Sequence, residues 1–289
     1  GVLINGKVVF QRLVLDQGFY PDGIYTAPTD EALKRDIELS MALGFNGARL
    51  HEKIFEERFL YWADKMGYIV WGEHANWGMD ITRASSLTHF IAEWIEAVER
   101  DYNHPSIVGW CPFNETPKNQ YSRVVEIVYE TTKVLDPSRP VIDVSGFHHV
   151  KGTDIYDVHC YEQEPAQMQR YLNLNDGEHI FDPNGDGQHY KGELFAVSEF
   201  GGIKFTDGSD KEAWGYGSVE TEDQFAEKFA GLTRVLMDNK FVCMACYTQL
   251  YDVEQEQNGL YKYDRSPKFS KQTYEKIRQA NIGIANIEK

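Results

Sequence analysis

Eight short apolar runs, separated mostly by longer amphipathic segments, constrain the fold of this chain more than any other feature. The runs have the length and composition of buried β-strands and lie at residues 12–16, 44–50, 67–73, 106–115, 140–146, 155–161, 194–200 and 241–250. Alternation of strands and helices predicts a parallel sheet covered by helices. Eight units in 289 residues favour a closed (β/α)8 barrel, because an open doubly wound sheet would more often show a glycine-rich phosphate turn after its first strand.

Helix signals occupy most of the intervals between these runs. The first interval opens with Thr29 or Asp30 as an N-cap and closes on Gly44. The predicted helical segments lie at residues 29–44, 56–67, 86–105, 121–140 and 221–239. Before all of them, "VLINGKVVF" predicts an N-terminal β-hairpin, since Asn5-Gly6 is the strongest two-residue turn signal.

Neither a linker nor a low-complexity segment divides the chain. Residues 173–192, rich in Gly, Asn and Asp, are interpreted as a long loop within a domain. We therefore expect residues 1–289 to form a single α/β domain, a (β/α)8 barrel preceded by the hairpin.

The balance of charge narrows the classes of partner. The formal net charge is −16 and is spread along the sequence, so the chain should repel phosphate backbones and is not expected to bind nucleic acid. Because no apolar stretch approaches the roughly 20 residues of a spanning helix and no signal-peptide pattern is present, we expect no membrane contact and a cytoplasmic location. The four cysteines lie in strand-like runs, which predicts buried free thiols.

Two of the apolar runs end in a carboxylate. "IVGWCPFNE" (107–115) ends on Asn114 and Glu115, and "LFAVSEFGG" (194–202) contains Glu199 at the same point. Active sites of such barrels lie at the carboxyl ends of the strands, so we expect the two glutamates to face each other across the barrel mouth. Cleavage of a glycosidic bond requires two carboxyl groups. One is protonated and releases the leaving oxygen, and the other is ionised and attacks carbon or activates water.

Each of these residues also has an alternative interpretation in which it has no catalytic or binding role. Most glutamates are exposed loop residues, and a single strand-end Glu would be interpreted in that way. Two such glutamates at corresponding strand ends, set among aromatic residues, favour a catalytic site. Several tryptophans could offer a face to a sugar ring, although each alone is more often packing: Trp71, Trp77, Trp110 and Trp214. No metal or cofactor is expected, because His148–His149 and the "CMAC" pair point to opposite faces of their strands.

Several motifs together resemble the catalytic barrel of glycoside hydrolase family 2. They are "GFNGARLHEK", "RFLYWADKMGYIVWGE", "NHPSIVGWCPFNE", "VSEFGG" and "YTQLYDVEQEQNGLYKYDR", and the resemblance extends from the hairpin to about residue 270. The family comprises retaining β-glycosidases, among them β-galactosidases, β-glucuronidases and β-mannosidases. The resemblance implies a retaining β-glycosidase, β-galactosidase-like, that hydrolyses terminal β-glycosidic bonds through a covalent glycosyl-enzyme intermediate.

The resemblance also implies roles for particular residues. Glu115 would be the acid/base and Glu199 the nucleophile. Asn114 would bind the sugar 2-hydroxyl, and Arg49 on the second strand would orient the nucleophile. The remaining substrate-binding candidates are His159 and Tyr161 beside the nucleophile, Tyr247 on the eighth strand, and Trp110.

The chain departs from the family pattern at points that affect the ligand. The aromatic that usually follows the acid/base is replaced in "NETPK" by Pro117, and Tyr247 is the nearest aromatic to the Trp that usually floors the sugar site. The Asn-x-Lys pair typical of glucuronidases corresponds to Glu256 and Asn258. An acidic group there disfavours a uronic acid, so a neutral β-glycoside is the expected substrate.

Two hypotheses follow. The β-sandwich domains that usually precede the barrel are absent from this sequence, so the missing domains of a parent chain are candidate partners. The leading hypothesis is an active retaining β-glycosidase. Its competitor is an isolated, truncated or engineered family 2 barrel with little or no catalytic activity.

Overall fold

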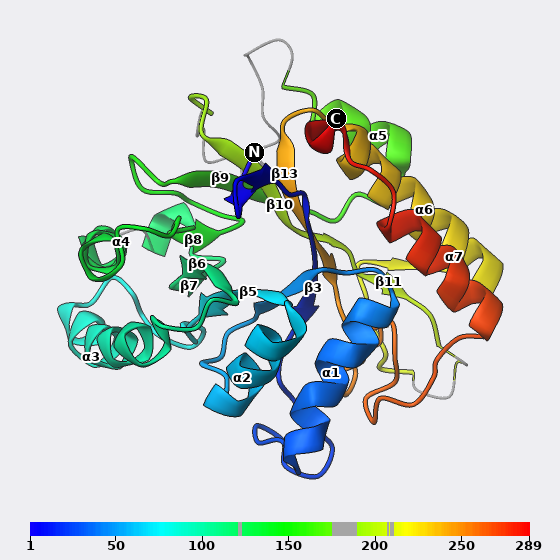
Figure 1. Cartoon of the computed structure of the whole chain (residues 1–289), viewed down its shortest axis with the longest axis horizontal. Helices are drawn as coiled ribbons and strands as arrows, with labels where there is room; N and C mark the ends of the chain where they lie inside the picture. Colours follow the sequence, from blue (N-terminus) through cyan, green and yellow to red (C-terminus); the bar gives the residue numbers. More distant parts are fainter. Residues whose placement is uncertain (121–122, 175–189, 207, 209–210) are drawn as a thin grey trace.

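A curled sheet of seven parallel strands forms the centre of the molecule (Figure 1). The computed structural model describes residues 1–120, 123–174, 190–206, 208 and 211–289. The strand order is β6-β5-β4-β3-β13-β10-β9, and every ladder in it is parallel. The strands are β3 (Gln11–Asp16), β4 (Gly47–Leu50), β5 (Ile69–Glu73), β6 (Ile107–Cys111), β9 (Ile155–Cys160), β10 (Leu194–Gly201) and β13 (Val242–Thr248). This arrangement confirms the predicted parallel α/β barrel and the order of its strands.

The fifth predicted strand is reduced to a short segment. β7 (Phe113–Asn114) extends the line of β6 and pairs in parallel with β8 (Val144–Ser145). Within the described residues no ladder joins β8 to β9. The side chain of Asp157 on β9 crosses that gap instead: its Oδ2 accepts hydrogen bonds from Gly146 N (2.8 Å), from Ser145 Oγ (3.3 Å) and from the hydroxyl of Ser198 on β10.

The contacts of Asp157 with Ser145, Gly146 and Ser198 form a side-chain seam between β8 and β9, and a buried histidine supports it. His149 Nδ1 lies 2.8 Å from Asp143 Oδ1, and its Nε2 lies 3.3 Å from Asp157 Oδ1. Burial alone lowers the pKa of His149, but the charges of Asp143 and Asp157 outweigh it and raise that pKa to about 9. The imidazolium therefore neutralises two buried carboxylates where the barrel lacks a backbone ladder.

The seam should make stability fall as pH rises. The pKa of His149 is higher in the folded than in the unfolded protein, so its protonation stabilises the fold. This stabilisation is complete below the unfolded pKa, near 6.5, and is lost by about pH 9. We expect the free energy of unfolding, relative to a His149→Gln variant, to fall by roughly 3 kcal/mol between these limits. Urea titrations of both proteins at several pH values measure the difference, and parallel pH profiles would contradict it.

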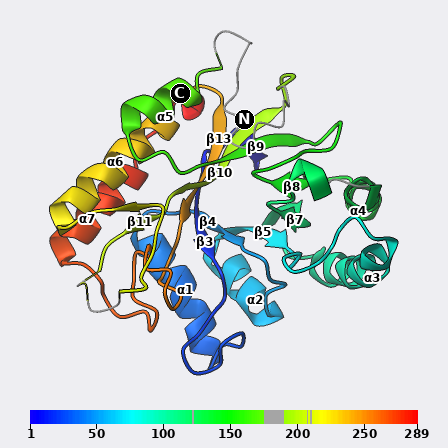
Figure 2. The same ribbon diagram turned by 180° about the vertical axis from the view of Figure 1, so that it is seen from behind.

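Seven α-helices of the described residues surround the sheet (Figures 1 and 2). They are α1 (Asp30–Ala42), α2 (Glu57–Met66), α3 (Ala84–Asp101), α4 (Arg123–Leu135), α5 (Pro165–Tyr171), α6 (Glu222–Asp238) and α7 (Lys271–Asn281). The predicted N-cap is confirmed, because the Thr29 side chain accepts from Ala32 N; α1 ends at Ala42, two residues before the predicted Gly44. The helix α2 ends at Gly67, which is in the left-handed conformation. Most of the predicted loop at 173–192 lies outside the described residues. None of the described helices is long and apolar enough to cross a membrane.

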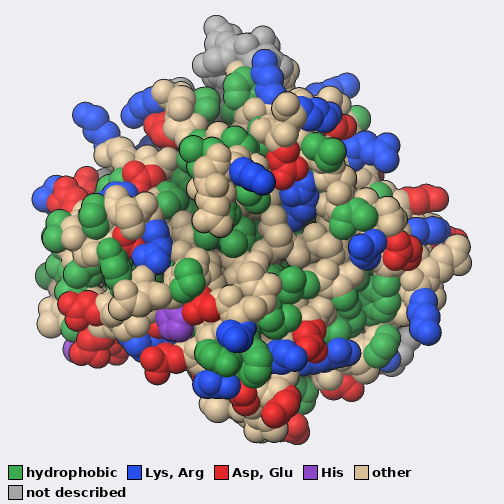
Figure 3. Space-filling view, in the orientation of Figure 1, with side chains coloured by type: hydrophobic (Ala, Val, Ile, Leu, Met, Phe, Trp, Pro, Cys, Tyr) green, Lys and Arg blue, Asp and Glu red, His purple; other side chains and the backbone are tan. Residues whose placement is uncertain are grey.

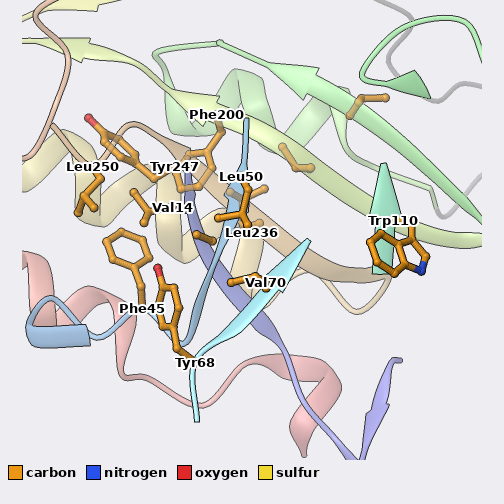
Figure 4. Packing of buried hydrophobic residues seen from close by; sticks show 14 of the residues in the cluster. Val14, Phe45, Leu50, Tyr68, Val70, Trp110, Phe200, Leu236, Tyr247 and Leu250 are labelled. Carbon is orange, nitrogen blue, oxygen red and sulfur yellow. The ribbon is translucent and has the colours of Figure 1, made fainter. Parts of the chain in front are cut away.

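Two layers of apolar side chains fill the structure. The outer layer packs the sheet against the helices and includes Val14, Val70 and Leu236 (Figure 4). The inner layer fills the barrel with Leu13, Leu15, Trp71, Cys111, Ile142, Ile155, Ala196, Cys243, Met244 and Cys246. The predicted hairpin is confirmed as β1 (Leu3–Ile4) and β2 (Lys7–Val8), and Val2 beside it packs against the inner layer. All four cysteines are buried free thiols, as predicted.

Candidate active site

Glu199 lies at the carboxyl end of β10 and is surrounded by hydrogen-bond donors. Its side chain is 4% exposed. Arg49 Nη1 donates to Oε1 at 3.1 Å, and the hydroxyl of Tyr161 donates to Oε2. Burial and the charge of Glu199 raise the pKa of Tyr161 well above its usual value, so the phenol keeps the proton that it donates. Charge-assisted donors of this kind stabilise a carboxylate that must act as an anion.

Arg49 connects three strand ends. It is fully buried on β4, and besides Glu199 it donates to Glu73 Oε1 (2.6 Å) and to Asn114 Oδ1 (3.1 Å). Burial alone would lower the pKa of Arg49, but Glu73 and Glu199 raise it well above its usual value. Its planar fork therefore fixes the directions of two carboxylates and one amide together.

The amide of Asn114 is held with its donor group unused. Because Arg49 Nη2 donates to Oδ1, the Nδ2 group points elsewhere, and it is buried without a hydrogen-bond partner among the described protein groups. Asn76 clamps the backbone of Asn114, accepting from its N (2.6 Å) and donating to its O (3.0 Å). A buried donor with no protein partner is suited to a ligand hydroxyl.

Glu115 is more exposed than Glu199. Its side chain is 25% exposed, and its Oε1 lies 2.9 Å from His159 Nδ1. Its φ of +50° lies in the left-handed region, which is uncommon for a residue with a Cβ and is typical of functional sites. The hydrogen bond from Glu115 N to Ser145 O (3.0 Å) holds this conformation at the end of β7.

His159 lies between the two carboxylates. Its Nδ1 is 2.9 Å from Glu115 Oε1 and 3.4 Å from Glu199 Oε2, and its Nε2 is 3.0 Å from Ser145 Oγ. Burial lowers the pKa of His159, but the two glutamates outweigh that effect and raise it. One atom each of Glu115, His159 and Glu199 lies within 4.8 Å of the others, so among the described residues this trio has the geometry to hold a cation. The same spacing lets His159 Nδ1 interact with both carboxyl groups.

Six of the sequence-predicted residues therefore meet at one place. They are Arg49, Asn114, Glu115, His159, Tyr161 and Glu199. Sequence reasoning did not single out Glu73, Asn76 or Thr248, whose Oγ1 lies 3.0 Å from the Tyr161 hydroxyl. Glu73 carried a usable signal, because it ends its strand in "IVWGE" as Glu115 and Glu199 end theirs.

Two predicted ligand contacts are wrong. Trp110 is buried, and its Nε1 donates to Asp136 Oδ2 (2.9 Å) on the helix side of the sheet. Tyr247 is also buried and packs against Phe200 and against Phe229 of α6. Side chains alternate between the two faces of a strand, and both residues belong to the cluster that packs the sheet against the helices, where Trp110 meets Trp94 of α3 edge-to-face. Trp71, a weaker candidate, is buried inside the barrel.

Three exposed aromatics lie on loops at the carboxyl ends of the strands. Trp77 follows β5 and is 59% exposed, whereas Trp214 and Tyr216 are 45% exposed each. The ring of Tyr216 stacks on Tyr161, and Trp214 packs edge-to-face on Tyr216. Acidic and basic side chains are interspersed over the surface seen in Figure 3. The candidate platforms for a sugar ring are thus loop residues and not strand residues.

Comparison with known proteins identifies the family. Residues 26–183 match the model of glycosyl hydrolases family 2, TIM barrel domain. The β-glucuronidase of Pongo abelii is 34% identical over 149 residues, which is 49% of this chain and 23% of that protein. The β-galactosidase of Lactococcus lactis is 30% identical over 165 residues, covering 54% of this chain and 16% of that protein.

Solved structures share the fold. A family 2 β-galacturonidase from Eisenbergiella tayi bound to galacturonate superposes with a TM-score of 0.73 at 19% identity, over 98% of this chain and 53% of that one. An FMN-binding β-glucuronidase from Faecalibacterium prausnitzii gives a TM-score of 0.77 at 18% identity, over 96% of this chain and 45% of that one.

The fold and the family match define a glycoside hydrolase barrel. The chain belongs to glycosyl hydrolases family 2, whose members are O-glycosyl hydrolases, and matches its TIM barrel domain. It spans about a quarter or less of the length of the curated relatives that it matches.

Proposed function

We propose that this barrel is the catalytic unit of a retaining β-glycosidase that acts on a neutral terminal sugar. The observation that supports this most is the spacing of the carboxylates: one oxygen of Glu115 and one of Glu199 lie within 4.8 Å of each other. Retaining enzymes hold their two carboxyl groups about 5–5.5 Å apart, whereas inverting enzymes need about 6.5–9.5 Å to admit a water between them.

The two glutamates then divide the reaction. Glu199 attacks the anomeric carbon while Glu115 gives its proton to the departing oxygen, which leaves a covalent glycosyl-enzyme. Glu115, now a carboxylate, takes a proton from a water molecule. The oxygen of that water attacks the same carbon, and the bond between this carbon and Glu199 breaks. Asn114 Nδ2 is placed to bind the sugar 2-hydroxyl, and Arg49 and Tyr161 fix the direction of Glu199.

The preference for a neutral sugar is supported by the loop after β13. Glu256 accepts hydrogen bonds from Gln17 Nε2 and Asn258 Nδ2, both at 3.2 Å. Burial raises the pKa of Glu256, and the charge of Glu199 adds to that effect, so the two carboxylates share one electrostatic environment. An acidic side chain at this place offers no positive charge to a sugar carboxylate. A uronidase remains the second candidate, because several relatives are named β-glucuronidases.

A panel of nitrophenyl β-glycosides tests the proposal: galactoside, glucoside, mannoside and glucuronide. We expect hydrolysis of at least one neutral member with retention at the anomeric carbon, and a kcat/KM for the glucuronide at least about tenfold lower. Rates should be equal with and without EDTA, because paired carboxylates need no metal. Hydrolysis of the glucuronide alone would favour the uronidase, and a folded protein inert toward every member would favour the inactive barrel.

A further inference from the structure

A hollow of about 380 Å³ is lined in part by Glu115, and Glu199 is not among its lining residues. It lies between the loop after β5 and the loop after β7. Its lining includes Asn76, Trp77, Met79, Glu115, Thr116 and Pro117. Because Glu115 is the proposed proton donor to the departing oxygen, this hollow lies where the leaving group must be.

Trp77 is presented to this hollow by a fixed backbone. Its N–H donates to Glu52 Oε2 at 3.0 Å, and the N–H of Asn76 donates to the same atom at 2.9 Å. The indole meets the ring of His51 edge-to-face, with centroids 5.3 Å apart. Trp77 is thus held at its backbone and at one edge of its ring. Because the residue is 59% exposed, one face of the ring is free for a ligand.

A second observation points to a ligand with hydroxyl groups. Thr116 is 1% exposed, it lines the hollow, and its Oγ1 is buried without a hydrogen-bond partner among the described protein groups. Buried hydroxyls normally have a partner. An apolar face beside an unused hydroxyl suits a pyranose ring, which has one face of C–H groups and a rim of hydroxyls.

We infer that this hollow is the subsite for a second pyranose, so that the substrate is a β-linked di- or oligosaccharide and Trp77 determines the leaving-group specificity. The inference rests on the proposed function and adds the class of leaving group to it. It also accounts for Pro117, where the family usually has an aromatic: here the neighbouring loop supplies the aromatic.

Glycosyl fluorides provide a test, because fluoride leaves without occupying this subsite. The probes are lactose against β-galactosyl fluoride and cellobiose against β-glucosyl fluoride. In Trp77→Ala we expect the ratio of kcat/KM for the disaccharide to that for the fluoride to fall at least about tenfold. Trp77→Phe should recover most of that loss. Tyr61→Ala, which removes an exposed aromatic from α2, is the matched control and should leave the ratio as it is.

Calorimetry separates failure of this inference from failure of the proposed function. Wild-type protein should bind lactose or cellobiose more tightly than the corresponding monosaccharide, and Trp77→Ala should abolish the difference, whether or not the barrel turns over. Equal affinities for disaccharide and monosaccharide, or a disaccharide-to-fluoride ratio that Trp77→Ala does not change, would overturn the subsite. Tight disaccharide binding without turnover would instead count against the proposed function alone.

Discussion

Glu199→Gln should lose activity toward every glycoside, on the order of 10⁵-fold in kcat, because no group remains to form the covalent intermediate. Glu115→Gln should differ in a way that depends on the leaving group. A glycoside of an acidic phenol needs little proton donation, so its first step should survive and the glycosyl-enzyme should accumulate. Stopped-flow measurement of phenol release should show a burst in Glu115→Gln and none in Glu199→Gln.

Azide distinguishes the two roles further. A small anion can attack the intermediate of Glu115→Gln without a general base, which should restore turnover and yield the β-glycosyl azide. Circular dichroism of both variants serves as the control for folding. Equal losses in the two variants on activated substrates, or an α-configured azide product, would reverse or refute the assignment.

Arg49→Met should have the largest effect on stability of any single substitution at the site. It leaves Glu73 and Glu199 buried without their common cation, and breaking a buried ion pair in this way costs about 3–5 kcal/mol. Turnover should fall as well, since Asn114 and Glu199 both lose a donor that orients them. Urea titration and the nitrophenyl assay measure the two losses.

The surface provides the matched control for this substitution. Arg58 pairs with Asp30 at 2.8 Å, but the two side chains are 54% and 36% exposed. Arg58→Met should therefore have little effect on stability, because solvent screens an exposed ion pair. Arg49→Lys keeps the charge and loses the planar fork, so it should recover part of the stability and little of the turnover. Similar costs for the two methionine variants would show that the buried network contributes little.

The positions of the site residues could be predicted from the sequence because the fold determines them. Strands that run parallel end at one edge, so Asn114, Glu115 and Glu199 had to meet once the alternation of strands and helices was recognised. Arg49, His159 and Tyr161 came from the family resemblance, and the structure brings them to the same place. The roles assigned to these residues stay predictions.

Side-chain direction was the main source of error. Trp110 and Tyr247 belong to the correct strands, but each faces the helices, and a one-residue change in strand phase is enough to reverse that direction. Composition cannot fix the phase of an apolar run that is buried on both faces. Asp157 was missed for a related reason, since a carboxylate in mid-strand gives no sign that it replaces a missing ladder.

The seam between β8 and β9 leaves this barrel with a pair of concealed sheet edges. A barrel closed by backbone ladders around its whole circumference has no edge to offer to a second molecule. Here closure depends on Asp157 and its partners, so releasing those side chains would uncover backbone groups of β9, among them the N and O of Asp157 that His149 Nε2 contacts, while the rest of the sheet stays folded. An uncovered parallel edge is a template for pairing between chains. Alkaline conditions that discharge His149 should therefore promote self-association of the barrel before they unfold it.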